Sequence, residues 1–394
     1  MTDSAATFSG FSWSWADEWI DRTPEMSGDE RTEGHAAVRY FRSLLGEDWQ
    51  ERATGRPLAT RFVCSFCGEP LECIRLHRLL KSLEGMVNLD LIIHDLAGPR
   101  WENFLSATQM ITFASALFRS GHQTEFIRPT PGLGQRPDLR TWLVDRWVNV
   151  ECTVLHEPQA VQDSHALERD LNKWFAEAQF AGAGVVTVEF EEITIDEAKR
   201  GLEGLKASMM RLARQGIQGS EHLPGYATAK FRPGSDGFWP VRVTRGPVVE
   251  RYSTINERTD AKRIQGRIPE KARQLAGGGP TLLLIQNNAL FCGLDDQDPH
   301  HTARLVAASI SNGLGRSPAI SAVLDYEEWS QQGSEGVRRF DGQSFRAAVG
   351  SHDGLNHYFA VLVTNPAGSC PLTNLECEAL MNLMPQAAKT PTAE

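Results

Sequence analysis

One ten-residue stretch, RWVNVECTVL at 146–155, constrains the fold of this chain more than any other. Side chains of a strand alternate between its two faces, so the valines and Cys152 form one apolar face. The other face carries Asn149, Glu151 and Thr153. A carboxylate inside an apolar strand is costly unless it is partnered. The stretch therefore predicts a buried strand whose acid has a partner, either a basic side chain or a metal ion.

Composition places the chain among globular proteins of the cytoplasm. Of its 394 residues, 41% are hydrophobic and 23% are charged, which is ordinary for a soluble domain. No apolar run approaches the ~18 residues of a membrane span, and the N-terminus lacks the pattern of a signal peptide. The seven scattered cysteines favour reduced thiols over a disulfide framework. We therefore expect a cytoplasmic protein without a membrane partner.

The charge balance limits the kind of nucleic-acid surface that this chain can present. Lysine and arginine number 40 against 50 acidic residues, a net charge of −10. An extended polyanion-binding surface is therefore not indicated, and tight nonspecific binding is not expected. Much of the acidic excess lies in the N-terminal segment, so a local basic groove elsewhere remains compatible with the sequence.

Periodicity and turn signals predict an α/β (α+β) fold with a mixed sheet flanked by helices and interrupted by an insertion. The expected core order is helix 69–97, a second helix to 119, strands 124–128, 139–144 and 147–155, a long helix 254–276 that Pro269 kinks or splits, strand 281–286, helix 301–312, and two final strands. The chain is expected to begin with an acidic, partly ordered segment at 1–58, followed by N-terminal helices and the first half of the core at 59–155. An α+β insertion at 156–252 then interrupts the core. The second half of the core follows at 253–386, and a tail ends the chain at 387–394.

Two acids flank the predicted hairpin in an arrangement suited to a divalent ion. Asp138 stands where the first strand begins, and Glu151 lies within the second strand after twelve intervening residues. Thr153 shares the face of Glu151. Carboxylate oxygens suit magnesium or manganese, and two convergent acids with a polar helper are what metal-dependent phosphodiester hydrolysis needs. Two other interpretations remain open: Asp138 is an ordinary turn acid, or Glu151 pairs with a buried arginine.

These residues resemble the PD-(D/E)xK, or restriction-endonuclease-like, nuclease superfamily. The matching motif is Pro137-Asp138 followed by Glu151-Cys152-Thr153, and the element order of helix, three strands, helix and strand is similar to that family's core. The likeness covers about residues 97–155 and 255–375. It implies a restriction-endonuclease-like core, a Mg²⁺ or Mn²⁺ ion held by Asp138 and Glu151, and hydrolysis of DNA or RNA.

The sequence departs from that family at the position of its lysine. Thr153 stands there, and a threonine can hydrogen-bond a water molecule but supplies no positive charge. Some members place the cation on a neighbouring helix. The candidates in the basic stretch 251–273 are Lys271 and, behind it, Lys262 and Arg267. Arg267, Lys271 and Gln274 share one helical face. Gln274 also stands where some members carry a glutamine that faces the site. A solvated helix face is the alternative for this stretch.

A second departure concerns the helix before the first strand. Members of the family often carry a glutamate on this helix, whereas the nearest polar residue here is Gln109. A glutamine on an apolar face is a candidate site residue, although a hydrogen-bonded core amide gives the same pattern.

A separate cluster of thiols and a histidine suggests a structural zinc site. Cys64 and Cys67 are spaced as Cys-x-x-Cys, and Cys73 and His77 are one helical turn apart. Four such ligands within fourteen residues could close a tetrahedral Zn²⁺ site. The alternative is free thiols and helix-face residues.

Three functions therefore compete. The first is a metal-dependent nuclease in which Asp138 and Glu151 hold the ion, Thr153 orients water and Lys271 supplies charge. The second is a catalytically inactive relative that acts as a nucleic-acid-binding or assembly module. The third is a zinc-stabilised regulatory protein unrelated to nucleases.

Overall fold

The structure is a computed structural model of the whole chain. It describes residues 11–394 except 24–25, 54–55, 64–68, 129–136, 156–166, 168–169, 172–173, 176–183, 234–240, 246–256, 276–277, 288–298, 331–335, 352–355 and 389–394. The described residues divide into two compact units. The smaller consists chiefly of residues 157–254, and the larger contains 11–62, 70–156 and 255–394.

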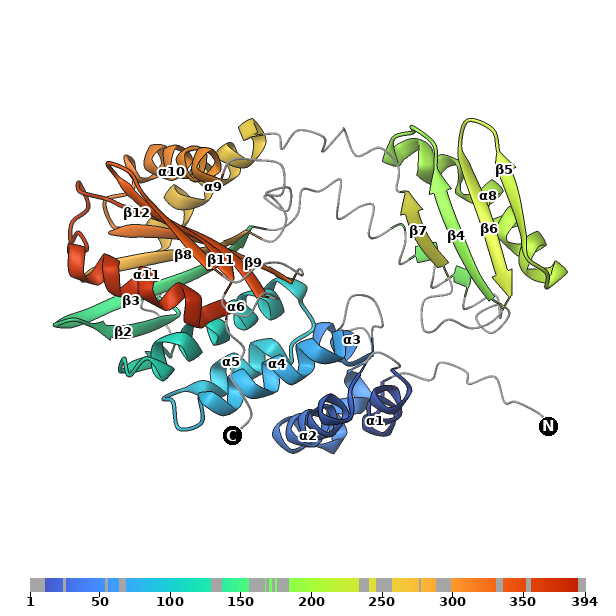
Figure 1. The fold of residues 1–394 in the computed structure, drawn as a ribbon, viewed down its shortest axis with the longest axis horizontal. Coiled ribbons are helices and arrows are strands. Elements are labelled where there is room, and N and C mark those ends of the chain that lie inside the picture. Colours follow the sequence, from blue (N-terminus) through green and yellow to red (C-terminus); the bar gives the residue numbers. More distant parts are fainter. Residues whose placement is uncertain are drawn as a thin grey trace. The chain divides into compact units, whose positions relative to one another are not determined.

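An eight-stranded mixed sheet forms the centre of the larger unit (Figure 1). Its strands, in spatial order, are β1 (Thr124–Phe126), β2 (Leu139–Leu143), β3 (Arg146–Leu155), β8 (Thr281–Asn287), β9 (Ala322–Ser330), β12 (Asn356–Thr364), β11 (Phe345–Ser351) and β10 (Gly336–Asp341). β8 pairs in parallel with both β3 and β9, and every other neighbouring pair is antiparallel. β3 therefore joins an antiparallel hairpin to the parallel centre of the sheet.

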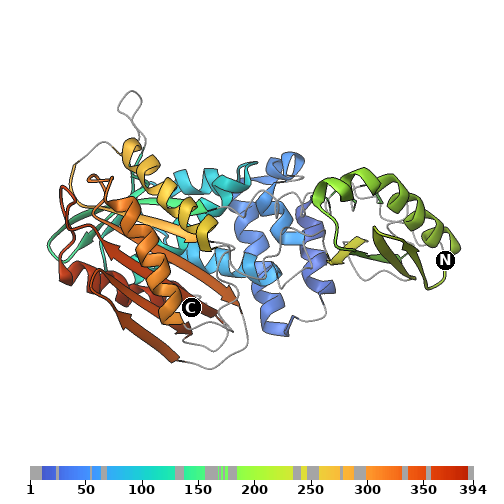
Figure 2. The same cartoon turned by 90° about the horizontal axis from the view of Figure 1, so that it is seen from above.

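Helices cover both faces of this sheet, which explains why its central strands are so apolar. α9 (Glu257–Gln274) and α10 (Pro299–Leu314) pack on one face and share a core cluster with β8, β9 and β12. α6 (Trp101–Arg119) and α11 (Asn374–Ala388) lie on the other face (Figures 1 and 2). The valine and cysteine side chains of β3 are buried, whereas Leu155, on the opposite face, belongs to the cluster under α9 and α10. The expected α/β class with a mixed sheet is confirmed.

The N-terminal part of the larger unit is helical. Its helices are α1 (Trp13–Arg22), α2 (Gly28–Leu45), the 3₁₀ helix η1 (Glu47–Arg52), α3 (Pro57–Val63), α4 (Glu69–Ser82) and α5 (Leu89–Leu96). Trp13 and Trp49 are buried and stack with ring centroids 5.4 Å apart. Phe62 packs edge-on against Trp13, so aromatic burial ties α1, η1 and α3 together.

The smaller unit, within the predicted insertion, has its own sheet and core. Its elements are β4 (Gly184–Phe190), α8 (Ile195–Gln215), β5 (Gly219–Leu223), β6 (Ala227–Pro233) and β7 (Val241–Arg245). The sheet order is β5-β6-β4-β7, in which β7 alone pairs in parallel. α8 begins with a capping box formed by Thr194 and Glu197 and buries Leu205 and Met209 on the sheet.

Several expected elements differ from the observed ones. The helix expected over 69–97 is two helices, because the chain turns at Gly85, whose φ of +90° favours glycine. Pro269 lies inside α9 without splitting it. The β10–β11 hairpin, β5 and α11 were not predicted, and α11 extends to Ala388 into the expected tail. None of the described helices combines the length and the apolarity needed to cross a bilayer.

Asp325 is a fully buried carboxyl group in the centre of the larger unit. It lies on β9 between Ile285 of β8 and Val361 of β12, both of which belong to the apolar cluster under α9 and α10. Neither carboxyl oxygen has a hydrogen-bond partner among the described residues. Burial raises the pKa of Asp325 from 3.8 to about 7, because the apolar surroundings disfavour its charged form.

We expect Asp325 to make the protein less stable as pH rises. The folded state holds the Asp325 proton more tightly than the unfolded state, so the free energy of unfolding falls between about pH 4 and pH 7 and stays low above it. At 1.36 kcal/mol per pKa unit, the difference between 3.8 and about 7 amounts to about 4 kcal/mol at most. Asp325→Asn should therefore raise the free energy of unfolding at pH 8 and change it little at about pH 4, as measured by urea unfolding. The exposed Asp341 provides the control Asp341→Asn. A wild-type pH profile in Asp325→Asn would contradict this account.

Candidate functional site

Asp138 is fixed at the junction of three strands by its own backbone. Its N–H donates to the carbonyl of Val150 (3.1 Å), and its carbonyl accepts from the N–H of Ile127 (3.0 Å). Its carboxylate Oδ2 accepts from the backbone N–H of Cys152 (2.7 Å). The acid just before β2 is therefore bonded directly to β3, beside Glu151.

Glu151 is buried in the middle of β3 and is bonded to a lysine of α9. Only 2% of the Glu151 side chain is exposed, and its Oε1 accepts from the Nζ of Lys271 at 2.6 Å. Lys271 is itself largely buried, with 12% of its side chain exposed. The lysine expected to come from the neighbouring helix therefore reaches the strand acid, although it is 120 residues away in the chain.

Thr153 contacts a second cation of the same helix. The Nε of Arg267 donates to Thr153 Oγ1 at 2.8 Å, and Arg267 Nη1 donates to both carboxylate oxygens of Glu270 at 2.8 and 2.9 Å. The hydroxyl of Thr153, two residues after Glu151, is thus bonded to a guanidinium. Arg267 was placed on the face of Lys271 by the sequence, but its bond to Thr153 was not foreseen.

Burial raises the pKa values of both acids above those of ordinary carboxyl groups. The pKa of Asp138 is raised, first because surrounding protein atoms desolvate it and next because the charge of Glu151 repels its own. Burial also raises the pKa of Glu151, against the opposing effect of the Lys271 charge. Two neighbouring carboxyl groups with raised pKa values are typical of functional sites, although buried ion pairs produce the same effect.

Asp95 is an acid near this site that the sequence did not reveal. It lies in the last turn of α5, and its charge contributes to the raised pKa of Asp138. Burial raises the pKa of Asp95 itself, and a hydrogen bond with Asn103 at the start of α6 opposes that rise. Nothing in the local sequence marks Asp95, because the fold alone brings α5 close to the start of β2.

Several buried polar atoms of three side chains in this part of the chain form no hydrogen bond with a described residue. Glu151 Oε2, Gln274 Oε1 and both amide atoms of Gln109 have no hydrogen-bond partner among the described residues. Gln109 is only 4% exposed, and the described residues supply none of the hydrogen bonds expected of a core amide. Buried polar atoms are usually satisfied, and such exceptions indicate water, an ion or a functional role. No described hydrogen bond joins Gln109 or Gln274 to Asp138 or Glu151.

The candidate ligands have the right chemistry for a divalent metal ion, but there are few of them. Asp138 and Glu151 contribute carboxylate oxygens, which magnesium and manganese prefer, and Glu151 Oε2 has no described partner. Within the described ranges, no group of three or more histidine, cysteine or acidic side chains is arranged to hold a metal ion. Two protein ligands suffice for magnesium only when water or substrate oxygens complete its shell.

The expected zinc cluster lies partly outside the described residues. Cys64 and Cys67 are among the residues that the structure does not describe. Cys73 is buried on α4. His77 packs its ring against Tyr40 at 4.7 Å, and burial lowers its pKa. The four-ligand zinc site stays a prediction.

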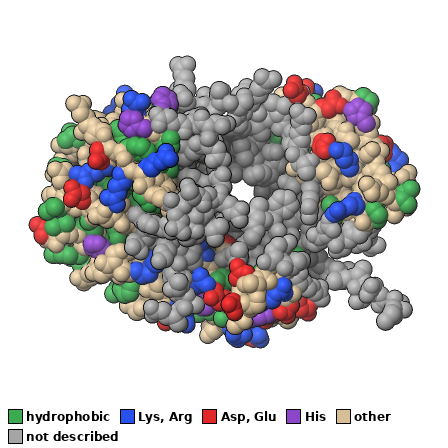
Figure 3. Space-filling view, in the orientation of Figure 1, with side chains coloured by type: hydrophobic (Ala, Val, Ile, Leu, Met, Phe, Trp, Pro, Cys, Tyr) green, Lys and Arg blue, Asp and Glu red, His purple; other side chains and the backbone are tan. Residues whose placement is uncertain are grey.

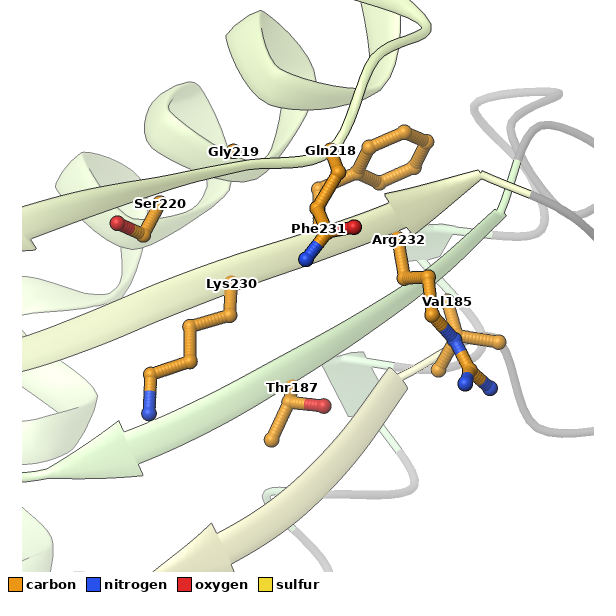
Figure 4. Close-up of a pocket in the computed structure, with 8 residues that line it drawn as sticks. All are labelled: Val185, Thr187, Gln218, Gly219, Ser220, Lys230, Phe231 and Arg232. Atoms are coloured by element: carbon orange, nitrogen blue, oxygen red, sulfur yellow. The ribbon is translucent and has the colours of Figure 1, made fainter.

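A depression of about 770 Å³ lies on the smaller unit, whereas the acid pair belongs to the larger unit. Ser220, Lys230 and Thr187 are paired across β5, β6 and β4, and they line this depression, whereas Phe231 points toward α8 (Figure 4). Lys230 is bonded to Glu189 at 2.6 Å, so its charge is already compensated. The depression lacks convergent acids and does not serve the same chemistry.

Comparisons of this chain with known protein families, with curated proteins and with solved structures found no significant match. Its function is therefore argued from the geometry of the acid pair and of the two cations on α9.

We expect Lys271→Met to destabilise the protein by about 3–5 kcal/mol, because it leaves Glu151 buried without a cation. Guanidinium or urea unfolding at pH 7.5 measures this loss. The double variant Lys271→Met with Glu151→Gln removes the unpaired charge and should recover much of the stability. If the double variant is as unstable as the single one, packing of the Lys271 stem, and not the ion pair, is what stabilises this region.

Proposed function

We propose that this protein is a metal-dependent phosphodiester hydrolase with a restriction-endonuclease-like core that acts on nucleic acid. The observation that carries the proposal is the pair of contacts from α9 to β3. Lys271 reaches Glu151, and Arg267 reaches Thr153. The positive charge that the strand motif lacks is thereby present beside the acids.

The core topology supports the same proposal. A helix (α6) precedes three antiparallel strands, and α9 then leads into β8, which lies parallel to β3. This is the order that the sequence resemblance implies. Asp138 beside β2 and Glu151 within β3 are joined through the Cys152 N–H, so the two acids belong to one hairpin.

Each residue has a role that its contacts suggest. Asp138 and Glu151 would hold a Mg²⁺ or Mn²⁺ ion, which when bound supplies Lewis-acid activation and lowers the pKa of water. Arg267 keeps Thr153 in place, and the Thr153 hydroxyl can accept or donate one further bond to water. Lys271 is positioned to stabilise negative charge on a phosphoryl oxygen. Because burial raises the pKa values of both acids, they would hold such an ion more tightly as pH rises.

One observation favours the alternative, a catalytically inactive protein of the same fold. Lys271 already compensates the charge of Glu151 at 2.6 Å without any metal. In that case the ion pair is structural, and the fold serves as a nucleic-acid-binding or assembly module.

We expect the purified chain to cleave a mixture of single-stranded and duplex DNA and RNA in 5 mM Mg²⁺ or Mn²⁺, at about physiological ionic strength, and to lose cleavage with EDTA. Asp138→Ala and Glu151→Asp should each lower the rate by at least about a hundredfold. Activity should rise with pH through the raised pKa values, because only the ionised acids hold the metal.

The matched control is Glu203→Ala, which removes a carboxylate that is 85% exposed on α8. It should leave cleavage unchanged. Mn²⁺ binding measured by electron paramagnetic resonance separates the two candidates. Binding that Asp138→Ala abolishes supports the hydrolase, whereas neither binding nor cleavage in the wild type leaves the inactive module.

A further inference from the structure

The hairpin that carries the acids also carries two tryptophans on the same face. Trp142 of β2 and Trp147 of β3 are cross-strand partners, with ring centroids 5.6 Å apart and planes at 88°. Because side chains alternate along a strand, Trp147 lies on the same face as Asn149 and Glu151, and Trp142 on the same face as Asp138. The tryptophan pair is therefore continuous with the acid pair.

A cation lies against this aromatic pair. The guanidinium carbon of Arg140 is 4.5 Å from the centre of the Trp147 ring. Glu125 of β1 bonds to Arg140 from the other side, which fixes the orientation of the guanidinium. The three side chains Arg140, Trp142 and Trp147 form what is called here the hairpin platform.

The hairpin platform and the turn beside it expose apolar side chains to solvent, which is costly. Trp142 is 39% exposed, and Val144 at the turn is 50% exposed. Val144 also has a φ of +57°, which is strained for a β-branched residue in a two-residue turn that ordinarily uses glycine. The strand before this turn is held in place, because the Trp142 N–H donates to the Gln123 carbonyl at 2.8 Å. Such strain in a rigid element is common at functional sites.

The spacing between platform and acids fits a nucleotide chain. Trp147 and Glu151 are four residues apart on one strand, which corresponds to about 13 Å. That is the span of about two nucleotides of an extended single strand. A phosphate at the acid pair would thus place a base about two nucleotides away against the tryptophans.

We propose that the hairpin platform binds an unpaired base of a single-stranded nucleic acid, and that single strands or frayed ends are the substrate class of this site. This inference rests on the proposed function. Every base has a π face, so aromatic stacking with a nearby arginine binds single strands without reading their sequence. Side chains of both charge signs are interspersed on the face drawn in Figure 3, and the net charge is −10. Stacking, and not a uniform basic field, is therefore the available source of affinity.

A duplex fits this surface less well. Its bases are already stacked on each other and present their edges, not their faces, to a protein. The edge-to-face arrangement of Trp142 and Trp147 offers one exposed ring and cannot enter a stack of paired bases without unpairing them. We therefore expect discrimination between single strands and duplexes to depend on Trp142.

The test measures binding with cleavage suppressed. Fluorescence anisotropy of a 5′-fluorescein-labelled 20-nucleotide oligothymidylate in Ca²⁺ gives Kd for the full chain and for three variants. We expect Trp142→Ala to raise Kd about tenfold, and Trp142→Phe, which keeps a π face, to raise it less than about threefold. Affinity for a blunt 20-base-pair duplex should be weaker than for the single strand and unaffected by Trp142→Ala.

The matched control is Trp174→Ala on the smaller unit, because Trp174 also has a cation, Lys206, over its ring at 5.4 Å. It should leave Kd unchanged, and circular dichroism melting should show that each variant is folded. Wild-type binding that Trp142→Ala leaves unaltered overturns the platform while the proposed function stands. Self-association that Trp142→Ala abolishes, without any change in Kd, makes the surface a protein contact and also overturns it. Absence of binding and of cleavage in the wild type means that the proposed function itself fails.

Discussion

The arrangement of β3 and α9 in the larger unit depends on the buried ion pair between Glu151 and Lys271. β3 is covered on both faces, so a carboxylate in its middle cannot reach bulk water and must have a cation or a metal. Removing one partner would leave an uncompensated buried charge. α9 is therefore held against β3 by electrostatics as well as by the apolar cluster that contains Ile264 and Ile268. The same contact brings two cations to the acid pair, so stability and site assembly come from one interaction.

Helix and strand geometry explain why two cations of α9 can contact two residues of β3. Arg267 and Lys271 are four residues apart, a rise of about 6 Å along a helix. Thr153 and Glu151 are two residues apart, about 6.6 Å along a strand. The lower-numbered helix residue meets the higher-numbered strand residue, so α9 runs antiparallel to β3. That is the direction required of a helix that connects two parallel strands, here β3 and β8.

Local sequence patterns were sufficient to predict the parts of the site that depend on strand alternation and helical spacing. Strand alternation placed Glu151 and Thr153 on one face, and helical spacing placed Lys271 with Arg267. Long-range geometry was not readable in this way. The approach of Asp95 to Asp138 depends on how α5 packs, and the unpartnered Asp325 looks in sequence like an ordinary strand residue at the end of AVLD. The β10–β11 hairpin was missed because its first strand is mostly exposed, which leaves a weak alternation of polar and apolar residues. The sequence did not predict α11, because this helix follows a turn-rich stretch. Its start is defined by a capping contact that involves Glu376.

That cap shows how the far end of the chain supports the hairpin. Glu376 accepts from the Thr373 N–H at 2.6 Å at the start of α11, and it also receives both Nε and Nη2 of Arg146 at 2.6 and 2.7 Å. Arg146 is the first residue of β3, directly after the strained turn at Val144. A bidentate bond of this kind fixes direction as well as distance. The hairpin is thus anchored at its tip by α11 and in its middle by α9, on opposite faces of the sheet.

The insertion lies between β3 and α9, the two elements that the Glu151–Lys271 ion pair joins. Residues 157–254 fall between β3 and α9, the two elements that supply the acid and the lysine. The entropic cost of closing a loop grows only slowly with the length of the loop. An insertion that folds around its own core therefore adds little further cost. The smaller unit has such a core, built from β4, β6 and α8. The Glu151–Lys271 bond must nevertheless form across 120 residues of chain. The crossover can tolerate so long an insertion because a strong, directional contact between β3 and α9, and not a short connection, determines where α9 packs.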